Sequence, residues 1–319
     1  MKTPYTIKTA ILKLTDSISE KLGEIKAAHL NKPPTELRKK NRIQTIQSSL
    51  EIEGNTLTFD QITAILENKR VVAPRKDILE VKTAIKVYNQ LGSFHPNSLK
   101  SLCDAHKILM EGLIDNPGKL RGKSVGIIKG AELAHLAPPG EMVKPLMTDL
   151  FNYLKNDPDL RLIKSCVFHY EFEFIHPFMD GNGRMGRLWQ TLILKEQDPV
   201  FAFLPVERLV KEQQTEYYSA LSKSDQSGNS TQFIEFMLGI IDQSLKDLLD
   251  TQNIVLTGED RIRLYRDVAK DEYFTRQEYL RYFKNISSAA ASRDLKAGVE
   301  NKILKKSGDK RTTKYKFAS

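Results

Sequence analysis

Residues 176–187 read HPFMDGNGRMGR, and this stretch decides how the rest of the chain is interpreted. It places one imidazole, one carboxylate, two guanidinium groups and three glycines within twelve residues. Gly and Asn tolerate backbone conformations that other residues avoid. The amides of residues 181–183 can therefore converge at the start of a helix, where N–H groups bind anions. The stretch predicts a loop that leads into a helix near Arg184 and binds a phosphate group.

The charged side chains of this stretch have the chemistry of phosphate transfer. His176 supplies an imidazole that exchanges protons near neutral pH. Asp180 supplies an oxygen ligand of the kind that Mg²⁺ shares with phosphates and water. Arg184 and Arg187 lie three residues apart on the predicted first turn and present fork-shaped donors to phosphate oxygens. Together these groups suit transfer at a nucleotide phosphate.

The glycines of this stretch also fit the spacing G-x-G-x-x-G of dinucleotide-binding proteins. That motif requires a preceding strand and an acidic residue about twenty positions later. The surroundings are helical in pattern, and the nearest acids, Glu196 and Asp198, come too early. We therefore exclude a dinucleotide site.

Outward from this stretch, apolar residues recur at spacings of three and four over most of residues 35–250, which predicts a mainly α body. Residues 121–140 lack that period and favour a short β-hairpin or an extended flap. The polar segment 251–260 ends the body.

The carboxyl-terminal segment has a different pattern. Three helical stretches, 261–270, 276–283 and 287–295, precede a basic hairpin at 305–317. This order is similar to a winged helix-turn-helix, in which the third helix enters a DNA groove. Residues 260–319 hold 16 Lys/Arg against 8 Asp/Glu, so they carry almost all of the net charge of +9. A solvated basic surface, or a helix face that packs against protein, explains the same residues equally well.

The composition excludes several classes of protein. Two cysteines make no disulfide framework and no metal cluster. No apolar run approaches the roughly 20 residues that a membrane span needs, and the first residues lack the apolar core of a signal peptide. We expect a cytoplasmic protein with no membrane partner.

At this point the motif resembles a known family. Residues 176–187 match the Fic motif, HPFx[D/E]GNGRxxR, at every fixed position. The resemblance implies a mainly α, Fic-type helical bundle with a short β-hairpin flap, followed by a winged helix-turn-helix domain. It divides the chain into an N-terminal helical region 1–110 with an inhibitory helix at 35–54, a catalytic core 111–250 and a winged-helix-like domain 251–319.

Fic enzymes transfer AMP from ATP to a protein hydroxyl, which implies ATP and Mg²⁺ as cofactors and a protein with Ser, Thr or Tyr side chains as substrate. By this resemblance His176 is the catalytic base and Asp180 the metal ligand. Asn182 and the neighbouring amides would hold the α-phosphate, and the two arginines the β/γ end. The residues expected to bind ATP are Gly181, Asn182, Gly183, Arg184, Met185, Gly186, Arg187 and Tyr218.

Two further features carry expectations from the family. The flap is expected to align the target as an added strand, through Val125, Gly126, Ile127, Ile128 and His135. Tyr217 and Tyr218 occupy the place of an adenine-contacting tyrosine, although a core role for at least one of them is equally reasonable.

A second motif concerns regulation. Residues 49–54, SLEIEG, match the inhibitory pattern [S/T]xxxE[G/N] of the family. Ser49 and Glu53 are four residues apart and share one helix face. The resemblance implies that Glu53 pairs with Arg187 and blocks productive binding of ATP. The alternative is a solvated glutamate beside a helix end.

Three functional hypotheses follow. The first is an autoinhibited protein adenylyltransferase that also modifies itself. The second is a DNA-binding regulator that uses the Fic core as a nucleotide sensor, with DNA bound by the basic carboxyl-terminal module. The third is an enzyme in which Glu53 positions a water molecule to remove AMP. The oligomeric state stays open, with a homodimer as one candidate.

Overall fold

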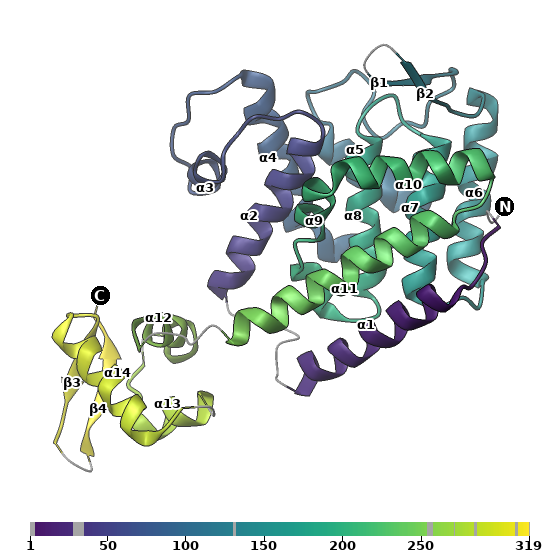
Figure 1. The fold of residues 1–319 in the computed structure, drawn as a ribbon. Helices are drawn as coiled ribbons and strands as arrows, with labels where there is room; N and C mark the ends of the chain where they lie inside the picture. Colours follow the sequence, from purple (N-terminus) through teal and green to yellow (C-terminus); the bar gives the residue numbers. More distant parts are fainter. Residues whose placement is uncertain are drawn as a thin grey trace. The chain divides into compact units, whose positions relative to one another are not determined.

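Helix follows helix along most of the chain, and two short β-hairpins interrupt the series (Figure 1). The computed structural model describes residues 4–27, 35–129, 132–253, 258–270, 272–283, 286–309 and 312–318. The chain divides into two compact units, one of residues 1–33 and 40–249, the other of residues 34–39 and 250–319. The predicted mainly α fold with a short hairpin is confirmed. The boundary expected at residue 110 stays a prediction.

Most of the helices lie in the first 253 residues. They are α1 (Thr9–Ala27), α2 (Thr35–Ile52), α3 (Phe59–Leu66), α4 (Arg75–Asn89), α5 (Leu99–Leu109), α6 (Gly140–Asn156), α7 (Arg161–Ile175), α8 (Asn182–Lys195), α9 (Val206–Glu212), α10 (Gln214–Ser227) and α11 (Thr231–Asn253), with the 3-10 turns η1 (Leu91–Ser93) and η2 (Pro199–Phe203). None of the helices among the described residues combines the length and apolar character that crossing a membrane requires.

Local sequence signals account for the ends of α2 and α3. Helix α2 ends at Ile52, and Gly54 follows with a φ of 91°, a left-handed conformation that suits glycine. Helix α3 begins with a capping box, because the Thr58 hydroxyl accepts the Gln61 N–H and the Gln61 side chain accepts the Thr58 N–H. The chain around the inhibitory motif is therefore shaped by its own residues.

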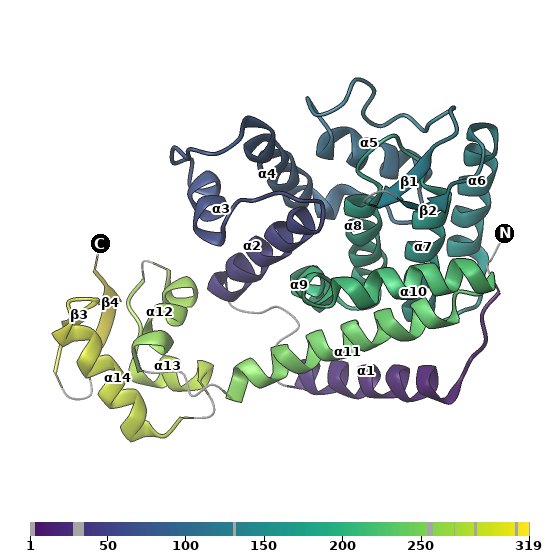
Figure 2. The same cartoon turned by 45° about the horizontal axis from the view of Figure 1, so that its top comes forward.

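Helix α8 forms the centre of the first unit, and α7 lies beside it (Figures 1 and 2). Its apolar side chains are buried, including Met185, Leu188 and Leu192. Trp189 is also buried, and its indole N–H donates to the Pro96 carbonyl at 3.0 Å. A helix buried all around its circumference is fixed in place. The loop between α7 and α8 is therefore held at both ends by the core.

The predicted flap is a hairpin of β1 (Gly126–Lys129) and β2 (Glu132–Leu136). The strands are antiparallel, with Ile127 opposite His135 and Ile128 opposite Leu133. An irregularity between Ile127 and Ile128 shifts the register, as a β-bulge does.

The second unit contains α12 (Gly258–Ala269), α13 (Arg276–Tyr282), α14 (Ser288–Glu300), β3 (Leu304–Ser307) and β4 (Lys314–Phe317). Strands β3 and β4 pair in antiparallel fashion, and Tyr315 of β4 also pairs with Phe274. Asp294 of α14 accepts two hydrogen bonds from Arg261 of α12, at 2.6 and 2.8 Å. The order of three helices and a hairpin agrees with the sequence pattern, whereas the assignment as a winged helix stays a prediction. Lys310 and Arg311 of the predicted hairpin lie outside the described residues.

Candidate active site

The loop between α7 and α8 contains the expected catalytic histidine. Helix α7 ends at Ile175, and His176 takes a left-handed conformation with φ 49° and ψ 61°. For a residue other than glycine this conformation requires support from its surroundings. Gly181, with a φ of 80°, is the N-cap of α8. The backbone thus turns sharply at both ends of the loop, and His176 stands where one helix ends.

Asn182 holds the loop closed. Its Oδ1 accepts the Phe178 N–H and its Nδ2 donates to the Phe178 carbonyl, both at 2.9 Å. The side chain is 2% exposed. Asn182 therefore shapes the loop through its two bonds to Phe178, and the contact of this residue with a phosphate stays a prediction.

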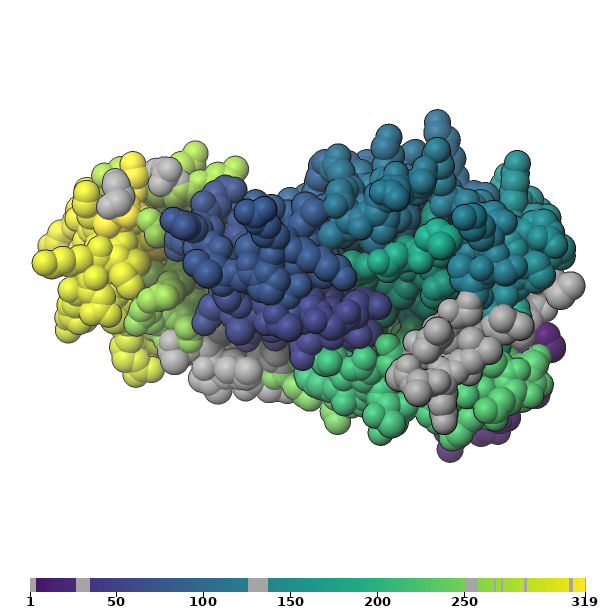
Figure 3. Space-filling view, turned by 90° about the horizontal axis from the view of Figure 1, so that it is seen from above, coloured from purple at the N-terminus to yellow at the C-terminus, as the bar shows by residue number. Residues whose placement is uncertain are grey.

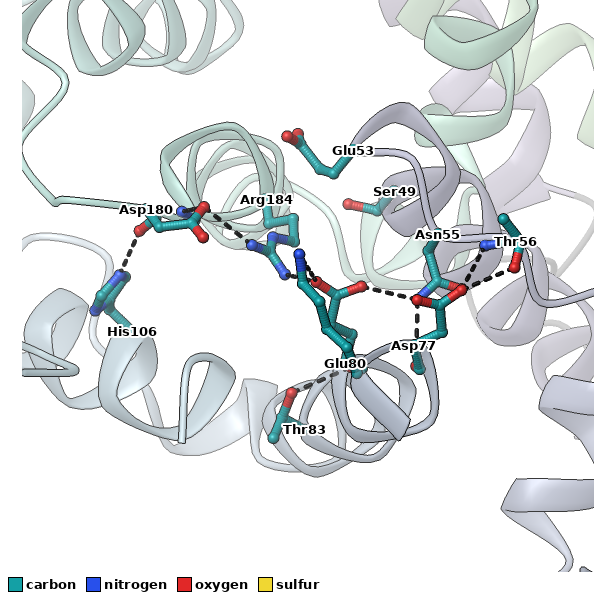
Figure 4. A network of polar contacts seen from close by, with 12 residues as sticks. Ser49, Glu53, Asn55, Thr56, Asp77, Glu80, Thr83, His106, Asp180 and Arg184 are labelled. Carbon is teal, nitrogen blue, oxygen red and sulfur yellow. Dashed lines mark hydrogen bonds and ion pairs between the residues drawn. The ribbon is translucent and has the colours of Figure 1, made fainter. Parts of the chain in front are cut away.

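Arg184 lies in a buried polar network (Figure 4). Its Nη1 is 3.3 Å from Glu80 Oε1, and its Nη2 is 3.3 Å from Asp180 Oδ1. The carboxylate of Asp180 also accepts the Gly181 N–H at 2.5 Å. Arg184 and Glu80 are almost fully buried, but more than half of the Asp180 side chain is exposed. The carboxylate expected to bind a metal therefore faces solvent beside the turn that is expected to bind a phosphate.

The same network reaches the end of α2, the helix that the sequence predicts to be inhibitory (Figure 4). Glu80 Oε2 accepts from Asn55 Nδ2 at 2.8 Å, and Asn55 follows Glu53 by two residues. Asp77 accepts from the Thr56 N–H and hydroxyl at 3.1 and 2.8 Å. Helix α4 thus fixes the segment that follows α2 and holds Arg184 at the same time.

Arg187 pairs with the inhibitory motif. Its Nη2 is 2.7 Å from Glu53 Oε1 and 3.0 Å from the Ser49 carbonyl, and its Nε donates to the Ser49 hydroxyl at 3.2 Å. Burial opposes the charge of Arg187, yet the neighbouring Glu53 raises the pKa of this guanidinium above its ordinary value. The sequence expectation placed these three residues together, and the structure brings them into contact.

The carboxylate of Glu53 lies directly over the start of α8. A Cβ built on Gly183 would be 2.5 Å from Glu53 Oε1, so a side chain at this position would collide with the carboxylate. A negative charge at a helix N-terminus is favourable. Glu53 therefore occupies the kind of position in which the sequence predicts a phosphate. In the space-filling view, α2 in purple lies against the teal-green surface of this region (Figure 3).

His106 was not singled out from the sequence, yet it supports the loop (Figure 4). Its Nδ1 accepts the Gly118 N–H at 2.8 Å, so Nε2 carries the proton and donates to the Asp180 carbonyl at 2.9 Å. The ring stacks on Phe178 at 3.6 Å between centroids. Burial lowers the pKa of His106 to about 4, which keeps the ring neutral.

The structure separates Tyr217 from Tyr218. Tyr217 is buried, and its hydroxyl lies 3.1 Å from His169 Nε2, while His169 Nδ1 lies 2.7 Å from Gln190 Oε1. Tyr217 is thus a core residue. Tyr218 is only half-buried, and it stays the candidate for adenine contact.

The remaining predicted residues have different surroundings. Met185 is fully buried in the core, and its expected contact with a nucleotide stays a prediction. A Cβ on Gly186 would be 2.9 Å from Glu173 Oε1, so this glycine allows α7 to approach closely. Val125 is half-buried just before β1. The other flap residues, Gly126, Ile127, Ile128 and His135, lie in the hairpin, of which the structure describes the backbone alone.

Asp180 is the candidate metal ligand. Within the described parts of the chain, no three His, Cys, Asp or Glu side chains gather as a protein-only metal site would require. Mg²⁺ at a phosphate-transfer site commonly takes one or two carboxylates and completes its shell with phosphates and water. The exposed carboxylate of Asp180, beside the turn expected to bind a phosphate, fits that donor set.

Comparison with known proteins agrees with this geometry. A model described as the Fic/DOC family matches residues 96–194. A probable protein adenylyltransferase of Aquifex aeolicus is 28% identical over 241 residues, which cover 68% of this chain and 73% of that protein. The protein adenylyltransferase Fic of Nematostella vectensis is 28% identical over 81% of this chain, but the match spans only 60% of its length.

Solved structures share the fold. Fic-1 from C. elegans has a TM-score of 0.61 at 20% identity and covers 76% of this chain and 72% of its own. The crystal structure of a Fic family protein from Desulfovibrio desulfuricans G20 has a TM-score of 0.78 at 36% identity, covering 100% of this chain and 99% of that chain. With this identity over both lengths, and with the His176–Arg187 loop at the start of a buried helix, the chain belongs to the Fic family.

Proposed function

We propose that the chain is an autoinhibited protein adenylyltransferase, a nucleotidyltransferase that uses ATP. The observation that carries the proposal is the Glu53 carboxylate over Gly183, paired with Arg187. The N-terminus of a helix favours an anion, and here the protein's own carboxylate, that of Glu53, lies at this position. The relatives named as protein adenylyltransferases support the same activity.

In the proposed reaction, the oxygen of a Ser, Thr or Tyr hydroxyl attacks the α-phosphorus of ATP. His176 accepts the hydroxyl proton, the new oxygen–phosphorus bond forms, and the bond to the bridging oxygen breaks so that pyrophosphate leaves. The N–H groups at the start of α8 face the charge that develops on the phosphate. Asp180 would hold Mg²⁺, which neutralises phosphate charge when bound.

The two arginines are proposed to bind the β- and γ-phosphates, and Tyr218 to contact the adenine. Arg184 is oriented for this role by Glu80. Arg187 becomes available only when Glu53 leaves it, because one guanidinium edge is taken up by Glu53 and Ser49. The hairpin β1–β2 is proposed to pair with the target main chain beside His176.

Mass spectrometry of the Glu53→Gly protein after incubation with ATP and Mg²⁺ tests this proposal. We expect one added AMP moiety on the protein itself or on proteins of a lysate, and little or none with the native chain. Glu51→Gly is the matched control, because Glu51 lies two residues earlier on α2 and faces Lys211 at 3.6 Å instead of Arg187. Absence of AMP transfer by the Glu53 variant would contradict the proposal.

The same variant distinguishes the reverse activity. If Glu53 positions a water molecule for removal of AMP, the native chain will release AMP from a modified target and the Glu53→Gly protein will not. The proposed enzyme instead gives more modified target when Glu53 is replaced.

A second candidate function concerns the basic second unit, which we propose to be a winged helix that binds DNA. Arg293 and Lys296 of α14 are exposed, as are Lys305 and Lys306 of β3. Cations on the third helix and on the hairpin are the arrangement that a duplex would contact. A mobility shift with duplex DNA that weakens steeply with salt supports this function, and a Lys305→Glu, Lys306→Glu variant would reduce the shift. Absence of a shift at low salt contradicts it.

A further inference from the structure

A buried arginine joins the flap to the catalytic loop. Arg121 is 4% exposed, and its guanidinium donates to four main-chain carbonyls. Nε donates to His176 at 2.7 Å and Nη1 to Lys123 at 2.7 Å, while Nη2 donates to Pro138 at 2.8 Å and to Ile175 at 2.9 Å. Among the described residues no carboxylate forms an ion pair with it. The side chain is therefore used to hold backbone.

Two of the four acceptors lie at the end of α7. The last carbonyls of a helix have no partner within the helix, and a cation at this end is favourable. The Arg121 guanidinium supplies both a hydrogen-bond donor and a cation there, because it donates to the carbonyls of Ile175 and His176. The backbone N–H of Arg121 also donates to the Pro177 carbonyl at 2.9 Å. It thus supports the residue that has the left-handed backbone and the proposed base.

The other two acceptors lie at the two ends of the flap. Lys123 precedes β1, and Pro138 follows β2. The two ends approach so closely that a Cβ on Gly140 would be 2.2 Å from the carbonyl carbon of Gly122. One planar guanidinium spans both ends and the end of α7 at once, which a lysine ammonium on a flexible stem does not reproduce.

We propose that Arg121 is a positioning residue that holds the flap and His176 in one register, so that a hydroxyl presented along the flap meets the imidazole. The inference rests on the proposed function, because alignment of a target hydroxyl has meaning only for transfer to a protein. In the proposed function nucleotide binding depends on α8, with Arg184 and Arg187, and the four carbonyls that accept from the Arg121 side chain all lie outside α8.

The test compares Arg121→Lys with its parent, both in the Glu53→Gly protein. We expect kcat for AMP transfer to fall on the order of 100-fold, since small misplacements of reacting groups have effects of this size. The KM for ATP should stay within about threefold of the parent, because the phosphate-binding groups are unchanged. Ile163→Val, a change in the buried start of α7, controls for a general loss of stability and should keep the parent kcat.

Gly140→Ala gives a second variant that leaves Arg121 intact but separates the two ends of the flap. It should lower kcat with an unchanged KM for ATP, so the proposal stays testable if Arg121→Lys does not fold. A kcat at the parent level in both variants would overturn the proposal. The proposal would also be overturned if ATP binding and AMP transfer were lost together, in proportion to the fall in melting temperature.

Hydrogen exchange separates this inference from the proposed function, because it needs no transfer reaction. In Arg121→Lys, exchange should become faster in β1, β2 and residues 176–181 together, and stay unchanged in the middle of α8. A parent that transfers no AMP would contradict the proposed function alone. Unchanged exchange in the flap and the loop would contradict the role of Arg121.

Discussion

Arg184 and Glu80 form a buried ion pair, with Nη1 3.3 Å from Oε1 and side-chain exposures of 5% and 8%. Arg187 and Glu53 form the second pair of the site, but the Glu53 side chain is 33% exposed. Both arginines are buried, so loss of either carboxylate leaves a buried cation, but water can reach the partly exposed position of Glu53 more readily than that of Glu80. The two pairs should therefore respond differently to the same substitution.

Glu80→Gln should destabilise the protein by about 3 kcal/mol and should not raise AMP transfer, because Arg184 loses its buried carboxylate and the exposed Asp180 compensates only in part. Glu53→Gln should raise AMP transfer with little change in stability. Thermal unfolding measures the change in stability of each variant, and transfer from labelled ATP measures the change in activity. Equal effects of the two variants would show that burial does not separate their roles.

His176→Ala in the Glu53→Gly protein should lower transfer by about 10²–10⁴-fold, the usual contribution of a general base. Binding of ATP should persist, since the phosphate-binding groups lie on α8 and not on the imidazole. Calorimetry with ATP measures binding, and a transfer assay measures catalysis, so the two effects can be separated. Loss of ATP binding together with transfer would mean that His176 supports the structure of the loop.

His106 predicts a loss of stability in acid. Its pKa is about 4 in the folded protein and 6.5 ordinarily, so the unfolded chain binds the extra proton between these values. The contribution of His106 to stability is complete above pH 6.5 and falls as the pH decreases toward 4, by up to about 1.4 kcal/mol per pH unit. His106→Asn should make this slope shallower in urea unfolding at pH 4.5–7. His95→Asn, at an exposed position, should leave it unchanged, and an equal slope in the His106 variant contradicts the argument.

Glu207 predicts the opposite pH dependence. It is buried, Tyr88 donates to it at 3.2 Å, and burial raises its pKa to about 7 from 4.5. The folded state therefore holds a proton that the unfolded state has released, and this contribution to stability is complete below pH 4.5 and is lost as the pH rises through 7. Glu207→Gln should raise the free energy of unfolding at pH 8 by up to about 3 kcal/mol and change it little at pH 4. Glu212→Gln, at an exposed carboxylate, should have no such effect.

The turn between α7 and α8 and the contact of Glu53 with Arg187 were predictable because each motif is a contiguous run of residues whose types restrict the backbone. Gly54 and Gly181 have the positive φ angles that glycine favours, and Glu53 is on the same helix as Ser49. The supporting residues could not be predicted in this way. His106 and Glu80 reach the loop from 74 and 104 residues away, and only the packing of α4 and α5 beside α8 brings them there.

Asn182 marks the limit of inference from residue type. The sequence indicates an amide beside the phosphate turn, but both of its polar groups bond the backbone of Phe178. An asparagine can bind a ligand or bond the backbone of its own loop, and the residue type alone does not show which way its side chain points. The role of Arg121 could not be predicted for a similar reason, because its acceptors are main-chain carbonyls, which every residue has.

The carboxylate over Gly183 also has a consequence for dose dependence. Glu53 belongs to the same chain as the site, so its effective concentration there is set by the chain and does not fall when the protein is diluted. In the proposed autoinhibited enzyme, ATP would therefore have to outcompete Glu53 at a concentration that does not depend on how much protein is present. A change that loosens residues 49–55 would lower that concentration without altering any group that touches the nucleotide.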